Sequence, residues 1–262
     1  MAGVKYTEDE CILALELYMT LERKDIRKTN QRIIGLSEFL TKHGHPRNVN
    51  SVKMKVENFK ACDPLYPGKS LTNYSDTDVA VWNRFYDVGF INLAEAADEA
   101  RRRISRGNDI ALDYNLLGLN VSGKTTTVEK RVRVNQEIFR ARVLTVYDSK
   151  CCITGMQIPE MLQACHIKPW RDSPENSPER IDPRNGLCLN KVHHAAFDEG
   201  LFTLDEHYRV ELSPMLEEKE QKDVLDRFYY PYEGKTIMVA INSFLPLQKY
   251  LDFHRKNIFI EG

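Results

Sequence analysis

The chain has 262 residues, enough for one large domain or two modest domains that each bury a core, and we expect two. Its formal net charge of −1 excludes a generally basic nucleic-acid coat protein, so any attraction to phosphate must come from local clusters. Lys and Arg outnumber Asp and Glu within residues 21–60 and again within 124–142. Solvated helix faces explain either cluster equally well.

The six cysteines follow a polar N-terminus without signal-peptide character, and no apolar run reaches membrane-spanning length. We therefore expect a cytoplasmic protein with no membrane partner, whose cysteines are thiols in a reducing compartment. The sequence contains no Cys-x-x-Cys pair, which argues against a zinc knuckle of the four-cysteine kind.

Residues 7–61 predict three short amphipathic helices. Thr7 begins the first, Thr29 or Asn30 caps the second, and the third covers about 50–61. Three short helices with a basic last one are typical of a helix-turn-helix domain, whose final helix lies in the DNA major groove. A plain three-helix packing domain has the same periodicity. The side chains that we predict to contact DNA here are Arg47, Ser51, Lys53, Lys55 and Asn58.

A further helical stretch over residues 76–106 completes a predicted helical DNA-recognition domain, 1–106. The residues that follow are polar and rich in Gly and Thr, which predicts a domain linker over 107–130. The chemistry of the chain is then expected in the remaining residues, 131–262.

The predicted linker contains residues 118–125, which match the phosphate-binding loop pattern letter for letter. That pattern binds nucleotide only between a buried strand and a helix, whereas residues 129–134 alternate polar and apolar like an exposed strand or an extended arm. We therefore treat an NTPase as a minor alternative, which loss of nucleotide turnover in Lys124→Ala would support.

Residues 135–144 predict an amphipathic helix with arginines on its polar side. The arginines in and just before it that we predict to contact DNA are Arg131, Arg133 and Arg140. A hairpin is expected next, with a first strand within 150–155 and a second, 161–167, returning antiparallel. This hairpin would place His166 at the end of its second strand.

Three polar sites follow in the order His166, Asn185 and the pair His193-His194. A one-metal phosphodiesterase needs this order: His166 could take a proton from water, and Asn185 could hold its imidazole by a hydrogen bond. One histidine of the pair could then bind a divalent cation. An asparagine after a loop is more often only a turn residue, and a lone histidine an ordinary surface or core residue. The combination predicts a nuclease.

The histidine pair lies on a predicted helix over residues 191–199, which Gly200 ends. Asp198 lies on the same helix, and residues four or five apart on a helix project within about a turn of each other. The pair and Asp198 therefore favour a metal site opposite His166. Their spacing from Asn185 does not decide which histidine faces the metal.

From about residue 131 to 259, these motifs resemble the HNH endonuclease family of bacterial restriction enzymes, whose ββα-metal core also occurs in colicin nucleases. The segments that carry the resemblance are Cys152-Ile-Thr-Gly155, Ala164-Cys-His166-Ile-Lys-Pro-Trp170, Asp182-Pro-Arg-Asn185-Gly-Leu-Cys-Leu189, His193-His-Ala-Ala-Phe-Asp198-Glu-Gly-Leu-Phe-Thr203 and His254-Arg255-Lys-Asn-Ile-Phe259. The stretch from Arg47 to Pro64 resembles domains found ahead of the same nuclease in other restriction enzymes.

The resemblance implies an α+β fold, with an N-terminal all-helical, helix-turn-helix-like domain followed by a ββα-metal nuclease domain over 131–262. It implies His166 as general base, Asn185 as the central asparagine and the His193-His194 pair as the metal-side histidine. From the resemblance and the helix spacing together, we predict His166, Asn185 and His194 as catalytic residues and His193 and Asp198 as metal ligands. Many relatives have Asp or His directly before the base as a ligand. This chain has Cys165 there, which suits soft metals better than magnesium.

The function that follows is a metal-dependent DNA endonuclease, a restriction enzyme that hydrolyses double-stranded DNA with one Mg2+ or Mn2+ ion. Cutting both strands requires two such sites, which predicts a homodimer. The alternative from another class is a DNA-binding regulator with a degenerate, non-catalytic HNH core. Incubation of the protein with supercoiled plasmid and Mg2+ or Mn2+ distinguishes the two. Nicking or linearisation favours the enzyme, and a gel shift alone favours the regulator.

Overall fold

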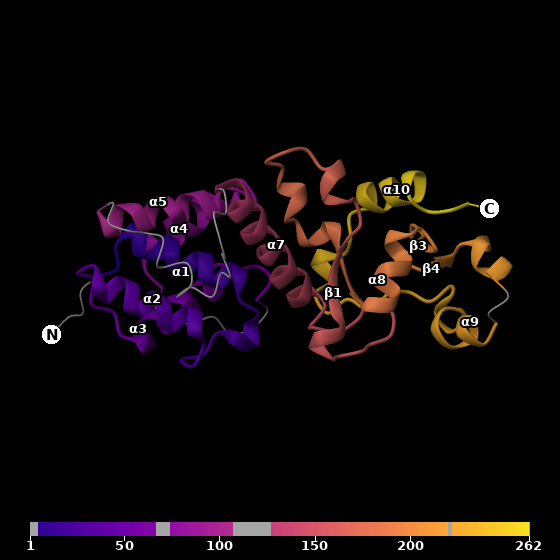
Figure 1. Ribbon diagram of the computed structural model, residues 1–262, viewed down its shortest axis with the longest axis horizontal. Coiled ribbons are helices and arrows are strands. Elements are labelled where there is room, and N and C mark those ends of the chain that lie inside the picture. The colour runs from indigo at the N-terminus through magenta and orange to yellow at the C-terminus, as the bar shows by residue number, and fades with distance from the viewer. Residues whose placement is uncertain (1–4, 67–73, 107–126, 220–221, 262) are drawn as a thin grey trace. The chain divides into compact units, whose positions relative to one another are not determined.

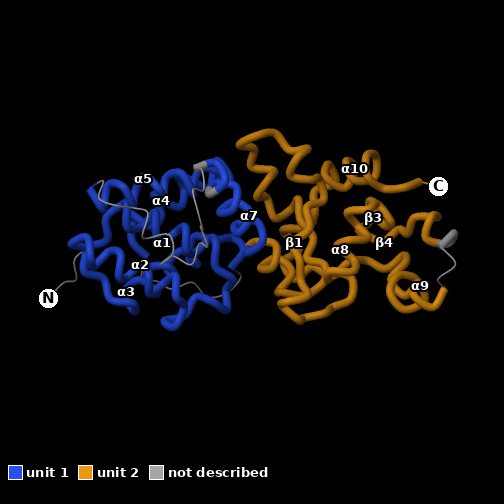
Figure 2. The backbone as a smooth tube through the Cα atoms, in the orientation of Figure 1, with its two compact units in different colours: residues 1–141 blue, residues 142–262 orange. Residues whose placement is uncertain are grey.

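The computed structural model of the chain describes residues 5–66, 74–106, 127–219 and 222–261 (Figure 1). The chain forms two compact units, 1–141 and 142–262, each with buried apolar side chains of its own (Figure 2). The boundary between the units falls inside helix α7 (Thr127–Val146), beyond the predicted linker. Most of that linker, including the phosphate-loop pattern at 118–125, lies outside the described residues.

The predicted exposed strand over residues 129–134 is wrong, because this segment forms the first turns of α7. Val134 and Ile138 are both buried and lie four residues apart, which is the spacing of one helix face. A short alternation of polar and apolar residues is compatible with both the two-residue period of a strand and the 3.6-residue period of a helix. Over the full length of α7 the apolar residues follow the helical period.

Unit 1 is helical throughout its described part, as predicted. Its α-helices are α1 (Glu8–Thr20), α2 (Gln31–Lys42), α3 (Val49–Asn58), α4 (Asp76–Tyr86), α5 (Leu93–Ser105) and the first part of α7, with 3-10 turns at Arg23–Asp25 and Phe59–Ala61. The predicted caps are confirmed, since Thr7 forms a capping box with Glu10 and Asn30 caps α2.

The core of unit 1 is built around α1, which contacts α2, α3, α4 and α5. Every residue of this helix from Glu10 to Thr20 is buried. A helix without a solvent face must pair the charges that it carries, because an unpaired buried charge is strongly destabilising. Arg47 accordingly binds Glu10, and Arg101 binds Glu16.

Unit 2 combines two small antiparallel sheets with helices, which confirms the predicted α+β fold (Figure 1). Its strands are β1 (Leu162–His166) with β2 (Gly186–Asn190), and β3 (Phe202–Leu204) with β4 (Val210–Leu212). Its helices are α8 (Lys191–Asp198), α9 (Lys222–Phe228) and α10 (Gln248–Asn257), with 3-10 turns at Pro159–Met161, Trp170–Asp172, Pro178–Arg180, Pro183–Asn185, Pro214–Lys219, Tyr230–Tyr232 and Asn242–Phe244. Across the described part of both units, we find no helix with the length and apolar character that crossing a bilayer requires.

The predicted hairpin between residues 150–155 and 161–167 is wrong. The chain makes a turn after Cys151, whose carbonyl accepts the N–H of Gly155, and Gly155 has a φ of +72°. β1 pairs instead with β2, and His166 lies opposite Gly186 in this pairing. All of β2 is buried, so the apolar side chains of this strand, rather than a local turn, select the partner of β1.

Helix α8 follows β2 directly, packs on both β1 and β2, and is held at its two ends (Figure 1). Asn190 caps its start by accepting two backbone N–H groups. At its end, Gly200 has a φ of +68°, and a Cβ there would collide with the backbone carbonyl of Ile258. His254 of α10 stacks on Phe197 and bonds its carbonyl oxygen at 3.0 Å. These contacts fix the side chains that α8 presents.

Candidate active site

His166 is the last residue of β1, and its side chain is mostly enclosed. Its Nε2 lies 3.0 Å from the carbonyl oxygen of Arg180. Because a carbonyl oxygen only accepts, Nε2 carries the proton and Nδ1 holds the lone pair of the neutral ring. Burial lowers the pKa of His166 to about 4, against the opposing effects of the Arg180 bond and the Asp198 charge. The ring is therefore neutral near neutral pH, the form that accepts a proton from water.

Asn185 is fully buried, and its amide bonds to backbone groups rather than to the base. Its Oδ1 accepts the N–H of Lys168 at 2.8 Å, and its Nδ2 donates to the carbonyl oxygens of Lys168 and Glu179 at 3.1 and 3.0 Å. The predicted bond between Asn185 and the His166 imidazole is therefore wrong. Asn185 holds the loop at Glu179, and the next residue, Arg180, supplies the carbonyl that bonds the base.

Two lysines hold the same loop from outside. The ammonium groups of Lys168 and Lys249 each lie 2.9 Å from a different carboxylate oxygen of Glu179. The hydrogen bonds from Lys168 and then Lys249 lower the pKa of Glu179. Partly exposed pairs stabilise little individually, yet together they restrict the segment that carries the Arg180 carbonyl.

The predicted role of His193 as a metal ligand is wrong. Its side chain is buried, with Nε2 2.8 Å from the Phe228 carbonyl oxygen and Nδ1 3.1 Å from Asn190 Oδ1, and it packs on the ring of Tyr229. Successive residues of a helix are rotated by about 100°, so His193 and His194 face different surroundings. His193 belongs to the core that supports α8, and His194 points to the site.

Three side chains from β1 and α8 form a cluster that we call the metal cluster: Cys165, His194 and Asp198. One ligand atom of each lies within 4.8 Å of the others. The His194 Nε2 lies 3.5 Å from Asp198 Oδ2, and the Cys165 Sγ donates to Asp198 Oδ1 at 3.4 Å. Burial and then the Asp198 charge raise the pKa of Cys165 well above its ordinary value. Cys165 directly precedes His166 in β1, and the charges of Asp198 and His194 respectively raise and lower the pKa of His166, so the metal cluster lies near the base.

The metal cluster fits a divalent cation. Its thiol, imidazole and carboxylate are all metal donors, and imidazole and carboxylate also suit Mn2+. The side chains of Asp198 and His194 are 53% and 31% exposed, whereas Cys165 is buried. The cluster is therefore open on one side, which leaves room for water and a phosphate as in catalytic metal sites. The predicted metal role of Asp198 agrees with this position, and the role given to His193 passes to His194.

The predicted DNA contacts of Arg47, Lys55 and Asn58 are wrong, because all three side chains are buried in unit 1. The Arg47 Nε lies 2.8 Å from Glu10 Oε1, and the Lys55 ammonium lies 2.8 Å from Asp78 Oδ1. Asn58 also bonds Asp78, at 3.4 Å. These polar side chains satisfy buried carboxylates instead of reaching solvent.

The other predicted DNA contacts remain accessible. Ser51 and Lys53 of α3 are partly exposed, as are Arg131 and Arg140 of α7, and Arg133 is exposed. Their role in binding DNA stays a prediction.

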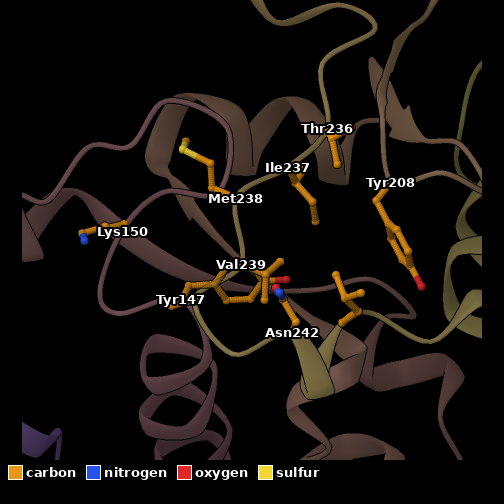
Figure 3. Close-up of a pocket in the computed structure, with 10 residues that line it drawn as sticks. Tyr147, Lys150, Tyr208, Thr236, Ile237, Met238, Val239 and Asn242 are labelled. Atoms are coloured by element: carbon orange, nitrogen blue, oxygen red, sulfur yellow. The ribbon is translucent and has the colours of Figure 1, made fainter. Parts of the chain in front are cut away.

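Unit 2 also contains a pocket of about 690 Å³, lined mainly by apolar side chains together with Lys150, Tyr208 and Asn242 (Figure 3). Tyr147 forms part of its wall and donates its hydroxyl to the carbonyl oxygen of Gly186, at the start of β2. The lining does not include the base or the metal cluster, so the pocket is separate from the candidate active site.

Residues 151–205 match the profile of the HNH endonuclease family. This segment contains β1, β2, α8, the base and the metal cluster. The match assigns an HNH endonuclease domain to this segment, which suggests a nuclease or DNA-binding role. HNH nucleases use divalent metal ions, for which the metal cluster offers a possible site. No match was found among curated proteins.

The Arg180 carbonyl was not predicted as the partner of the base, whereas Cys165 was noted in the sequence only as a departure from the Asp or His of many relatives. The sequence did contain a signal that favours His194 over His193 as the partner of Asp198, since His194 and Asp198 are four residues apart and His193 and Asp198 are five. The spacing of four is the one that brings helical side chains together. The Arg180 contact leaves no such signal, because any residue supplies a carbonyl.

Proposed function

We propose that the protein is a metal-dependent endonuclease that hydrolyses phosphodiester bonds of double-stranded DNA, and that it acts as a restriction enzyme in the cytoplasm. One observation carries the proposal: the neutral His166 imidazole, oriented by Arg180, lies in the same site as two cation donors, His194 and Asp198. A general base and a cation site side by side are what one-metal hydrolysis of a phosphodiester requires.

In this mechanism His166 accepts the proton of the attacking water at Nδ1. The bond from its Nε2 to the Arg180 carbonyl keeps the ring oriented and strengthens as the ring becomes charged. His194 and Asp198 would hold the cation, for which we expect Mg2+ or Mn2+. Such an ion, when bound, neutralises charge on the phosphate and on the departing 3′-oxygen. Asn185 acts as a positioning residue through the loop that carries Arg180.

We propose that the DNA is held by cationic and polar side chains outside the catalytic site, namely Ser51, Lys53, Arg131, Arg133 and Arg140. Lys and Arg bind the phosphate backbone, contribute salt-dependent affinity and position the duplex. The two strands of DNA are antiparallel, and one active site addresses one strand at a time. We therefore propose that the enzyme works as a homodimer.

Purified protein incubated with supercoiled plasmid and Mg2+ or Mn2+ tests this function. We expect nicking or linearisation, and His166→Ala should reduce it by about a hundred- to ten-thousand-fold while DNA binding in a gel shift persists. His207, an exposed histidine of the same unit, provides the matched control, and His207→Ala should cleave like the wild type. A wild-type protein that shifts DNA without cutting it would support the DNA-binding regulator instead.

The restriction role has a separate test. Methylated and unmethylated DNA are digested in parallel and the ends are sequenced. A restriction enzyme should cut at one recurring sequence, and its cutting should change with methylation. Cuts scattered without sequence preference would contradict the restriction role and leave the nuclease function intact.

A further inference from the structure

We propose that Cys165 is itself a ligand of the metal ion, and that its sulfur raises the affinity of this centre for thiophilic divalent ions such as Zn2+ and Co2+ relative to its affinity for Mg2+. The inference deepens the proposed function, since it rests on the metal cluster being the cation site of the nuclease. It goes beyond it by adding a third ligand of a different chemical kind.

The distances within the cluster are close to those around one small ion. A tetrahedral centre with metal–sulfur bonds of about 2.3 Å and metal–nitrogen or metal–oxygen bonds of about 2.0–2.1 Å places its ligand atoms about 3.3–3.6 Å apart. The Cys165 Sγ lies 3.4 Å from one oxygen of Asp198, and the His194 Nε2 lies 3.5 Å from the other. These two separations involve different oxygens of Asp198, but one donor atom from each of the three residues lies within 4.8 Å of the others, so small side-chain movements would bring the three donors around one ion.

The fold aims the Cys165 sulfur at α8. Cys165 pairs with Leu187 across the sheet, and both side chains are fully buried. α8 packs on the same two strands and presents His194 and Asp198 from consecutive turns. Because Asn190 and Gly200 hold both ends of this helix, the three donors are oriented before any ion arrives.

The chemistry of the donors sets the selectivity. Mg2+ prefers oxygen ligands and gains little from sulfur, whereas Zn2+ and Co2+ bind thiolate, imidazole and carboxylate together. Binding replaces the S–H bond of Cys165, which now donates to Asp198, with a sulfur–metal bond, and the thiol proton passes to solvent. The resulting centre has one sulfur, one nitrogen and one oxygen ligand and keeps a position for water.

Absorption spectroscopy with Co2+ as the probe tests the ligand directly. The full-length wild-type protein should show a thiolate-to-cobalt charge-transfer band in the near ultraviolet on titration with Co2+. Cys165→Ser, which changes little in size, should lose this band. Cys62 is a partly exposed cysteine of unit 1, and Cys62→Ser should keep the band. A band that persists in Cys165→Ser, or that is absent from the wild type, would overturn the inference.

Metal affinities test the selectivity. Since nitrogen and oxygen sites also bind Zn2+ more tightly than Mg2+, the informative quantity is the change in the Zn2+-to-Mg2+ affinity ratio caused by removing the sulfur. Loss of a direct ligand should weaken Zn2+ binding by at least about the ten- to hundredfold seen for outer-shell groups. Both Cys165→Ser and Cys165→Ala should show this loss and leave Mg2+ affinity no weaker. An unchanged ratio in a variant with wild-type circular dichroism would contradict the proposal.

The experiments distinguish failure of the proposed nuclease function from failure of the proposed sulfur ligand. A protein that cuts plasmid with Mg2+ but gives no Cys165-dependent cobalt band is a nuclease without a sulfur ligand. A protein that gives the band but cuts no DNA with any divalent ion has the metal centre without the proposed function.

Discussion

The imidazole Nε2 of His166 and the carbonyl oxygen of Arg180 lie 3.0 Å apart, although 14 residues separate them in the chain. This contact sets the tautomer of the candidate base through the loop between β1 and β2. Asn185 and two lysines, Lys168 and Lys249, hold that loop around Glu179. The orientation of the base is therefore a property of the loop as a whole.

Asn185→Ala should slow DNA cleavage without removing the metal site. The change removes the side-chain amide that hydrogen-bonds the backbone N–H of Lys168 and the backbone carbonyl of Glu179. Each lost hydrogen bond should lower the free energy of unfolding by about 1–3 kcal/mol. The Arg180 carbonyl next to Glu179 is then held less firmly. Cleavage rate and Co2+ affinity should be measured together, with Asn176→Gly, an exposed position of the same loop, as control. An equal loss of metal binding would argue against a role through the base.

His193→Ala and His194→Ala should fail in opposite ways. His193 is buried, with its Nε2 2.8 Å from the Phe228 carbonyl oxygen, so its removal should lower the free energy of unfolding by about 1–3 kcal/mol or more and leave metal affinity similar in the folded fraction. His194 is partly exposed beside Asp198, so its removal should weaken metal binding at least tenfold or so with little change in stability. Urea unfolding and metal titration distinguish them. The reverse pattern would exchange their roles.

The stability of unit 2 should fall in mild acid because of His254. Burial lowers its pKa from 6.5 to about 4, against the opposing bond to Phe197 and the Asp198 charge. The unfolded chain binds the proton more readily, so the stabilisation from the neutral ring is complete above about pH 6.5 and is lost as the pH falls toward 4. A pKa difference of this size corresponds to roughly 3 kcal/mol.

Urea unfolding at several pH values between 4 and 6.5 measures this dependence. His254→Gln removes the titrating ring and should flatten the curve, although other buried histidines will keep part of the slope. His207→Gln changes an exposed ring and should leave the curve as in the wild type. If both variants keep the full slope, His254 is not its source.

Two basic residues of unit 1 should respond differently to substitution. Arg47→Met removes the guanidinium that pairs with the buried Glu10 carboxylate and should lower stability by about 3–5 kcal/mol. Lys53→Ala removes a partly exposed ammonium and should cost little stability, but reduce DNA affinity and lower the salt slope of binding by about one. Thermal melting and gel shifts at several salt concentrations check both. Unchanged DNA binding in Lys53→Ala would remove this residue from the proposed contacts.

Several features could be predicted because they depend on residues that are close together in the chain. The cap at Thr7, the turn at Gly200 and the helix carrying His194 and Asp198 all follow from contacts within one or two turns. The placement of His166 at a strand end also held, because the loop after it is local. Such interactions are short in range, so neighbouring residue types are sufficient to specify them.

The remaining features depend on which distant segments pack together. The partner of β1 is chosen by the burial of β2, more than 15 residues further along, and not by the nearer turn at Gly155. Long-range packing also buries Arg47, which pairs with Glu10 and does not reach solvent. It places His193 in the core of unit 2 and Cys165 in contact with Asp198. A side chain reaches its partner only after the apolar faces have docked. The local sequence pattern was therefore sufficient to identify the residues of the site, whereas their roles depend on how distant segments of the chain pack together.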